Sequence, residues 1–278
     1  MASQGPRPVE PVDRAHLTAA DRPSPPIWRY APSDDLGDLV MRYWVPVWDL
    51  PAGLTWSQQV LQYPVCLIVV STTYAIAVGP DTGLGRVDLA GTGWGVGTML
   101  QPAAGSLLLG GSVAPLTDHR VDLATLPSLD GARLVEEIRG IMAPDPASPR
   151  RHLEALRAVE SRIRRLGPVD EAGQVCNNVV ALLEARPDIV HVADLCAALR
   201  MTERSLQRLT TERMGLTPKW LIQRRRLHDA TLAIKEGRGD LASIAVESGY
   251  ADQAHFTRDF KRFTGMTPGA YLRAQRPA

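Results

Sequence analysis

The apolar positions follow two different patterns along the chain. Between about Trp28 and Asp122, short apolar runs alternate with turn residues, as in residues 65–78, "VCLIVVSTTYAIAV". A β-branched run bounded by proline and glycine is typical of strands, so this run predicts one or two of them. "GVGTML" and "SLLLGG" are further strand candidates. The region is therefore expected to form a mostly-β sandwich or barrel.

Helical spacing begins after "ATLPSLDG". The segments "ARLVEEIRGIM" and "RRHLEALRAVESRIRRLG" have apolar residues at helical intervals and are separated by the loop "APDPASP". From Glu171 onward almost the whole chain is predicted to be helical, so the fold class is α+β with two domains. We expect these divisions: 1–27, a flexible proline-rich leader; 28–130, a β domain; 131–172, a helical linker that mediates dimerisation; 173–278, an all-α domain.

The helical part contains an internal repeat. Residues 204–218, "RSLQRLTTERMGLTP", align with residues 254–268, "AHFTRDFKRFTGMTP", at an offset of 50 residues. Each copy follows a short apolar helix, "VADLCAAL" or "LASIAVES". A short helix, a tight turn and a second helix form a helix-turn-helix unit. The sequence therefore predicts two such units, at about 192–214 and 241–264.

The second helix of each unit has an apolar side and a polar side. All three phenylalanines of the chain, Phe256, Phe260 and Phe263, lie at helical spacing within the second unit. Beside them run polar and basic side chains of the kind that read base edges in a major groove. The predicted DNA contacts are Arg204, Gln207 and Arg208 in the first unit, and Gln253, Ala254, Thr257, Arg258 and Lys261 in the second.

A long helix is predicted between the units, from Pro218 to about Glu236. Nineteen residues span roughly 28 Å, somewhat less than the ~34 Å between successive major grooves on one side of DNA. DNA bent towards the protein would close the difference at a cost of about 1–6 kcal/mol. The arginines of "QRRRLHD" (223–229) are expected to divide between phosphate contacts and acidic neighbours, with Leu227 packed inward.

Charge is unevenly distributed along the chain, and this supports DNA contact by the C-terminal part. Residues 192–278 contain 15 Lys and Arg against 9 Asp and Glu, whereas residues 1–191 contain 16 against 21. A basic block on a mildly acidic body favours contact of one end with a polyanion. The three cysteines are widely spaced and predicted to be reduced thiols. With no secretory signal and no long apolar run, the expected location is the cytoplasm.

The segment "IAVESGYADQAHFTRDFKRFTGMTPGAYLR" resembles the C-terminal signature of the AraC/XylS family of transcriptional regulators. "VADLCAALRMTERSLQRLTTERMGLTPKWLIQRRRLHDATLAI" is similar to the first unit of that family, and together the matches cover 173–278. The resemblance implies double-stranded DNA as partner and two helix-turn-helix units joined by a helix. On matching positions, the family's base contacts fall on Arg204, Gln207 and Arg208, and on Gln253, Ala254, Thr257 and Arg258.

The first unit departs from the family pattern at three positions. Cys196 replaces a usual alanine, Arg200 replaces a usual glycine, and Thr210 stands in the place of Phe260. If Arg200 takes the left-handed conformation, the cost is about 1–2 kcal/mol. We therefore predict that Arg200→Gly raises the melting temperature.

The N-terminal region is similar to the cupin-like sensory domain that precedes many such DNA-binding domains, on "LVMRYWVPVWDL" and "GTMLQPAAGSLLLGGSVAPLTDHRVDLATL". The resemblance implies an unidentified small-molecule effector or protein partner, a homodimer, and RNA polymerase as a further partner. Activation and repression both remain open.

Other chemistry is disfavoured by the residues themselves. A metal-binding cupin needs clustered histidines, and of the six only His119 lies in the β region. No catalytic residue, cofactor or metal is predicted. "GTGWGVG" (91–97) lacks the dinucleotide-binding spacing and is interpreted as a strand or turn. Most of the five N-terminal tryptophans are expected in the core rather than in an effector pocket, and Cys66 is expected to be a buried thiol.

Two alternatives to a regulator stay open. The first is an enzyme, such as a repair protein, fused to a DNA-binding tail. It requires a catalytic cluster in residues 28–130, where none is found. The second is a protein-interaction module that has lost DNA binding, which the departures in the first unit would allow.

Overall fold

The computed structural model describes residues 5–8, 25–60 and 63–275. The strands are β1 (Arg7–Pro8), β2 (Ile27–Ala31), β3 (Val40–Asp49), β4 (Thr55–Val60), β5 (Leu67–Ser71), β6 (Ala75–Val78), β7 (Gly85–Ala90), β8 (Thr92–Leu100) and β9 (Arg120–Asp122). The helices are α1 (Ala104–Leu109), α2 (Gly131–Met142), α3 (Pro149–Ile163), α4 (Glu171–Ala185), α5 (Val192–Leu199), α6 (Glu203–Met214), α7 (Pro218–Lys235), α8 (Leu241–Glu247), α9 (Gln253–Thr264) and α10 (Pro268–Gln275). The expected leader, residues 1–27, lies mostly outside the described residues.

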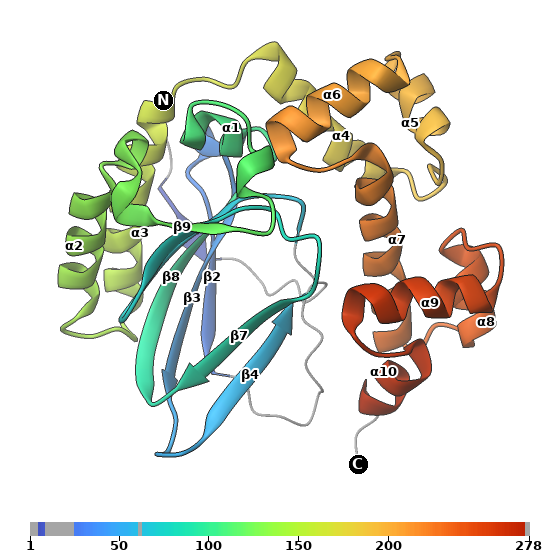
Figure 1. Cartoon of the computed structure of the whole chain (residues 1–278). Coiled ribbons are helices and arrows are strands. Elements are labelled where there is room, and N and C mark those ends of the chain that lie inside the picture. Colours follow the sequence, from blue (N-terminus) through green and yellow to red (C-terminus); the bar gives the residue numbers. More distant parts are fainter. Residues whose placement is uncertain (1–4, 9–24, 61–62, 276–278) are drawn as a thin grey trace.

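The N-terminal region is β-rich, as the sequence predicts. Seven strands form an antiparallel sheet in the order β1-β2-β3-β8-β5-β6-β9, and β4 pairs with β7 in a separate two-stranded ribbon. The ribbon lies on the side of the sheet opposite to α2 and α3 (Figure 1). Residues 65–78 contain two strands, β5 and β6, and the glycine-rich segment 91–97 lies largely in β8.

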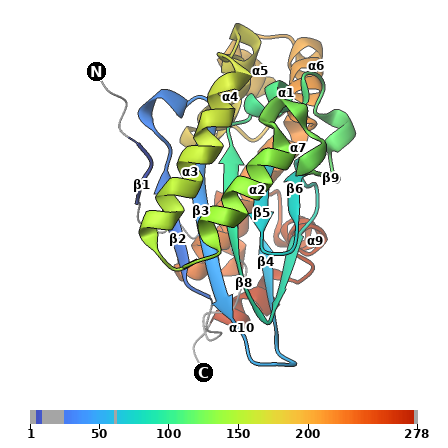
Figure 2. The ribbon, with the colours of Figure 1, turned by 90° about the vertical axis from the view of Figure 1, so that its left-hand side faces the viewer.

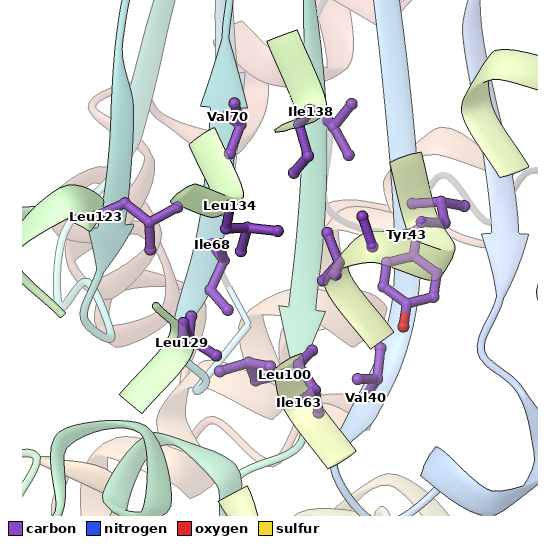
Figure 3. Close-up of a cluster of buried hydrophobic side chains, with 14 of the residues drawn as sticks. Val40, Tyr43, Ile68, Val70, Leu100, Leu123, Leu129, Leu134, Ile138 and Ile163 are labelled. Atoms are coloured by element: carbon purple, nitrogen blue, oxygen red, sulfur yellow. The ribbon is translucent and has the colours of Figure 1, made fainter. Parts of the chain in front are cut away.

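The helices α2 and α3 cover one face of the sheet (Figure 2). Their apolar sides supply Leu134, Ile138 and Ile163, which pack on Tyr43 and Ile68 of the strands in one buried cluster (Figure 3). Residues at alternate strand positions share a face. The neighbours of these strand residues therefore point to the other side of the sheet, towards the β4–β7 ribbon.

One predicted strand is wrong. "SLLLGG" belongs to helix α1, not to the sheet. Leucine is a good helix former, and Gly110 ends the helix with a φ of 66°, in the left-handed region that favours glycine. The apolar run is therefore the buried side of a short helix, and its period could not be read from so few residues.

The C-terminal part is all-helical and contains two separate apolar clusters. One includes Leu195, Leu206 and Met214, from α5 and α6; the other includes Phe256 and Phe260 of α9. The pairs α5–α6 and α8–α9 are the predicted helix-turn-helix units, and they lie at opposite ends of α7 (Figures 1 and 2). No helix in the described ranges is long and apolar enough to cross a membrane.

Candidate nucleic-acid interface

The second unit, α8–α9, is built around the phenylalanines. Phe256, Phe260 and Phe263 are buried, and the ring centroids of Phe256 and Phe260 lie 5.5 Å apart in an edge-to-face arrangement. Asp252 caps α9 by accepting a hydrogen bond of 2.6 Å from the backbone N–H of His255. Gly249 provides the turn, with a φ of 76°. The helix is thus fixed on one side and capped at its start.

The opposite side of α9 carries the predicted base contacts of this unit. The structure places Gln253, Ala254, Arg258 and Lys261 on the surface, and Thr257 is half-buried between this surface and the core. All five lie on one stretch of α9, at the spacing of a helix face. A rigid helix therefore presents amide, hydroxyl and basic groups together.

The first unit repeats the arrangement with a different core. Thr202 caps α6 by accepting from the backbone N–H of Ser205 at 3.2 Å. Arg204, Gln207 and Arg208 are exposed on the first half of that helix. The three predicted contacts of this unit therefore also share one exposed face.

Arg200 has the left-handed conformation that the sequence leaves open for it. Its φ is 54° and its ψ is 40°, at the end of α5. The backbone N–H of Met201 donates to the carbonyl of Cys196 at 3.0 Å. In the other unit the N–H of Tyr250 donates to the carbonyl of Ala245 at 2.9 Å. Both turns thus close with the same backbone hydrogen bond, but the first holds an arginine where the second holds Gly249.

The helix α7 joins the units as a single straight segment of 18 residues. It is about 27 Å long at 1.5 Å per residue, in agreement with the predicted strut. Thr217 caps it by accepting from the N–H of Trp220 at 3.1 Å, and Pro218 occupies its first turn. Thr267 and Pro268 begin α10 in the same way, so the repeat extends beyond the recognition helices.

The expectation that some arginines of α7 contact phosphate is wrong. Arg224, Arg225 and Arg226 are at most 8% exposed. Arg225 forms an ion pair with Asp229 at 2.7 Å and donates to the carbonyls of Pro187 and Ile189, at 3.0 and 2.8 Å. These carbonyls lie in the loop between α4 and α5, so Arg225 ties α7 to the first unit.

Arg226 ties the same helix to the second unit. Its Nε donates to the carbonyl of Ser248 at 2.7 Å, and its guanidinium lies 3.9 Å from the centre of the Tyr250 ring. Burial lowers the pKa of Arg226 and raises that of Tyr250 to about 12. A run of arginines indicates charge, but only the tertiary structure shows that Arg225 and Arg226 donate to carbonyls inside the domain.

The β-rich region holds the C-terminal end of α6, a contact that the sequence does not reveal. The N–H of Val113 donates to the carbonyl of Glu212 at 2.8 Å, and the Thr117 hydroxyl donates to Gly215 at 2.9 Å. Arg213 forms an ion pair with Asp170 at 2.6 Å. The N-terminal half of α6, with its exposed polar face, is free of these contacts.

A second candidate site is a hollow of about 960 Å³ between the sheet and the β4–β7 ribbon. Trp44, Trp48 and Trp56 line it, whereas Trp94 lies in the main core and Trp28 packs against that core. Trp48 and Trp56 are nonetheless buried, in a cluster with Leu89, so the expectation that most of the five tryptophans lie in the core holds for them and for Trp94, while Trp44 is half-buried. Alternation along β3 brings two of the tryptophans to the hollow, because Trp44 and Trp48 share the face opposite to Tyr43.

The thiols and the potential metal ligands show no reactive arrangement in the described segments. All three cysteines are buried free thiols, and burial raises the pKa of Cys66 to about 12, so its thiolate is disfavoured. Within the described segments, no group of three His, Cys, Asp or Glu residues lies close enough to hold a metal ion.

Comparison with known proteins finds a match in each half of the chain. A helix-turn-helix domain family matches residues 195–274, and a domain of unknown function, DUF6597, matches residues 28–122. An uncharacterised HTH-type transcriptional regulator of Haemophilus influenzae is 25% identical over 96 residues, which is 34% of this chain and 32% of that protein. The raffinose operon regulatory protein RafR of Pediococcus pentosaceus is 30% identical over 83 residues, 30% of either chain.

This chain thus spans about a third of the length of these curated relatives. The crystal structure of ToxT from Vibrio cholerae aligns with 81% of this chain and 89% of that one, at 17% identity and a TM-score of 0.39, too low to establish a common fold. The matched family, the named relatives and the paired helical units agree with the resemblance found in the sequence. The C-terminal part of this chain is an AraC-type helix-turn-helix domain.

Proposed function

We propose that this protein is a non-enzymatic transcriptional regulator that binds a specific DNA sequence through both units. In this proposal α6 and α9 enter neighbouring major grooves on one side of the duplex. Lysine and arginine side chains and helix N-termini hold phosphates, and the two polar faces read bases. The base contacts would be the eight residues identified in α6 and α9.

One observation carries the proposal. Arg208 and Arg258 occupy equivalent positions in the repeat, and both are exposed. Neither guanidinium has a hydrogen bond or ion pair in the described part of the chain, although many other arginines do. Two exposed cations at the same site of two homologous helices fit a partner with repeating negative charge.

The length of α7 supports contact with one side of the DNA. At about 27 Å it is shorter than the ~34 Å helical repeat, so we propose that the bound DNA bends towards the protein. Binding to circularly permuted DNA fragments tests this, because a bend makes electrophoretic mobility depend on the position of the site. Equal mobility for all permutations would exclude the bend.

The function itself is tested by the salt dependence of DNA binding. Each neutralised phosphate contributes about −0.9 to the slope of log K against log salt, so wild-type affinity should fall steeply. Arg258→Ala should cost about 1–3 kcal/mol on a selected site and relax specificity at one base pair. Arg150→Ala is the matched control, because it removes one exposed arginine from α3, outside both units.

Three outcomes separate the proposal from its rivals. Equal losses for Arg258→Ala on selected and random DNA would make Arg258 a phosphate contact. Equal losses for Arg150→Ala and Arg258→Ala would remove the second unit from the interface. Binding without salt dependence would favour the protein-interaction module over a DNA-binding regulator.

The proposal extends to the rest of the chain. The region 28–130 would sense a small molecule or partner, the linker 131–172 would mediate homodimerisation, and 173–278 would bind DNA and contact RNA polymerase in the cytoplasm. The inner sides of α2 and α3 pack on the sheet, and their outer sides carry charged residues such as Arg133 and Glu136. Sedimentation velocity at increasing concentration tests the dimer.

A further inference from the structure

The sheet is apolar on both faces, but helices cover only one of them. On the uncovered face Leu67, Val69, Ile76, Val78 and Met99 line the hollow of about 960 Å³. Trp56 and Leu89 of the β4–β7 ribbon close it from the other side. Pockets of about 300–1,000 Å³ with predominantly apolar walls are typical of small-molecule sites.

The floor of the hollow is an aromatic platform set on glycines. Trp44 faces Gly97 across the sheet, and Trp48 faces Gly93. A Cβ atom at Gly97 would lie 2.1 Å from Cε2 of Trp44, so the indole lies directly over the backbone of β8. A Cβ at Gly93 would lie 2.4 Å from Cζ2 of Trp48. The absence of side chains at these two glycines allows both indoles to lie against the backbone of β8, where they line the hollow.

Positive charge flanks this platform. Arg42 lies two positions before Trp44 on the same face of β3, and Arg29 pairs directly with Trp44 from β2; both arginines line the hollow. The Arg42 guanidinium lies 5.1 Å from the centre of the Tyr63 ring. It has no acidic partner among the described residues.

The acidic groups around the hollow already have donors. Asp88 accepts from Arg86 and from the Ser57 hydroxyl. Asp118 accepts from the backbone N–H of Thr82 at 2.6 Å. The buried Nε1 of Trp56, in contrast, has no acceptor in the described part of the chain. The site therefore offers donors and positive charge next to stacked rings.

We propose that the hollow binds a planar aromatic organic acid, whose ring stacks on Trp44 and whose acid group pairs with Arg42. This inference rests on the proposed function, because the ligand would serve as the regulator's effector. Aromatic rings favour offset stacking or edge contacts with indole, and guanidinium binds a carboxylate or sulfonate through two parallel hydrogen bonds. The positive charge of Arg42 and Arg29 beside the platform disfavours a cationic ligand.

The same site has a direct contact with the DNA-binding domain. Tyr63 lines the hollow and packs edge-to-face against His228 of α7, with ring centroids 5.0 Å apart. A bound acid that draws Arg42 away from the Tyr63 ring changes the surroundings of Tyr63, and Tyr63 is the residue that packs on α7. Because α7 fixes both units through Arg225 and Arg226, the ligand can alter the relative placement of the two recognition helices.

Binding is tested on the full chain with two fluorescent probes that share an anilinonaphthalene ring system. One is 1-anilinonaphthalene-8-sulfonate, and the other is the uncharged N-phenyl-1-naphthylamine. We expect one saturable site per chain, with the sulfonate bound about tenfold more tightly because of Arg42. Equal affinity for the two probes would contradict the role of positive charge.

Three variants locate the site. Gly97→Ala lifts the Trp44 ring off the sheet and should weaken both probes at least about tenfold. Gly140→Ala is its control, because Gly140 lies in α2 on the other side of the sheet, the added Cβ meets nothing within 4 Å, and affinity should stay within about twofold. Arg42→Met should weaken only the sulfonate, by about tenfold.

The outcomes are distinct from those of the DNA experiment. Wild-type affinity for both probes in Gly97→Ala, or for the sulfonate in Arg42→Met, overturns the proposed ligand site. If Gly97→Ala does not fold, Trp44→Leu removes the platform instead, with the same expectation. Failure of the ligand site leaves salt-dependent DNA binding intact, whereas failure of the proposed function removes DNA binding and leaves probe binding intact.

Discussion

The two helix-turn-helix units have the same backbone plan but are stabilised in different ways. The second has an aromatic core, in which Phe256 contacts Tyr250 and Phe260 contacts Tyr271. The first has no aromatic residue at the position equivalent to Phe260, where Thr210 is buried instead. Its recognition helix is held at the C-terminal end by the β-rich region.

Because of this difference, the two units are expected to respond differently to the rest of the protein. The N-terminal region is hydrogen-bonded to the end of α6, whereas it meets the second unit through Leu84, which packs against the aromatic cluster. We therefore expect a signal from the N-terminal region to act more strongly on the first unit. Seven substitutions at four places in the structure, ordered by expected effect, test the comparison.

The largest effect is expected at the equivalent core positions. Phe260→Ala removes a fully buried ring and should destabilise the second unit by about 3–5 kcal/mol. Thr210→Ala should cost the first unit only about 1 kcal/mol, because the hydroxyl makes a single weak hydrogen bond, to Gln207 at 3.5 Å. Native-state hydrogen exchange in α8–α9 and α5–α6 measures each loss. Similar losses in both units would contradict the comparison.

The second-largest effect is expected at the buried arginines of α7, each of which should destabilise only one unit. Arg226→Met leaves the carbonyl of Ser248 without its donor and should cost about 2 kcal/mol, with faster amide exchange in α8. Arg225→Met should cost a similar amount, with faster exchange in the loop between α4 and α5. If either substitution loosens both units equally, the two arginines do not each serve one unit.

A smaller effect is expected at the turns of the two units, where the two substitutions should change stability in opposite directions. Arg200→Gly should relieve a left-handed arginine and raise stability by about 1 kcal/mol. Gly249→Ala should lower stability by a similar or larger amount, because φ is 76° and the new Cβ lies 2.6 Å from Cγ1 of Val190. Melting temperatures measure both. An unchanged or lower value for Arg200→Gly would argue against strain at this turn.

The smallest effect is expected at the contact between domains. Thr117→Val removes the hydrogen bond to the carbonyl of Gly215 and should weaken docking of α6 by about 0.5 kcal/mol, the low end for one hydrogen bond. Amide exchange should rise at the C-terminal end of α6 and stay unchanged in α9. A rise in both helices would show that the second unit also depends on the N-terminal region.

The sequence predicts the helical units well because their signals are local. The repeat and the glycines after each recognition helix are short-range features, and the structure has them where the pattern placed them. The left-handed Arg200 is likewise a property of one turn.

The rest depends on tertiary contacts that no local pattern encodes. The buried arginines of α7 look like a solvated basic run until their carbonyl acceptors are brought together by folding. The tryptophans of β3 could have been assigned from alternation with Tyr43, had the strand been recognised. The docking of α6 onto the β-rich region joins segments about 100 residues apart.

The central claim is that the two recognition helices contact successive grooves of one duplex. Hydroxyl-radical footprinting on DNA selected by the full chain tests it most directly, with wild type, Arg208→Ala and Arg258→Ala compared. We predict two protected segments about 10 base pairs apart, with Arg208→Ala weakening one and Arg258→Ala the other. A single protected segment, or the same segment weakened by both substitutions, would contradict the claim.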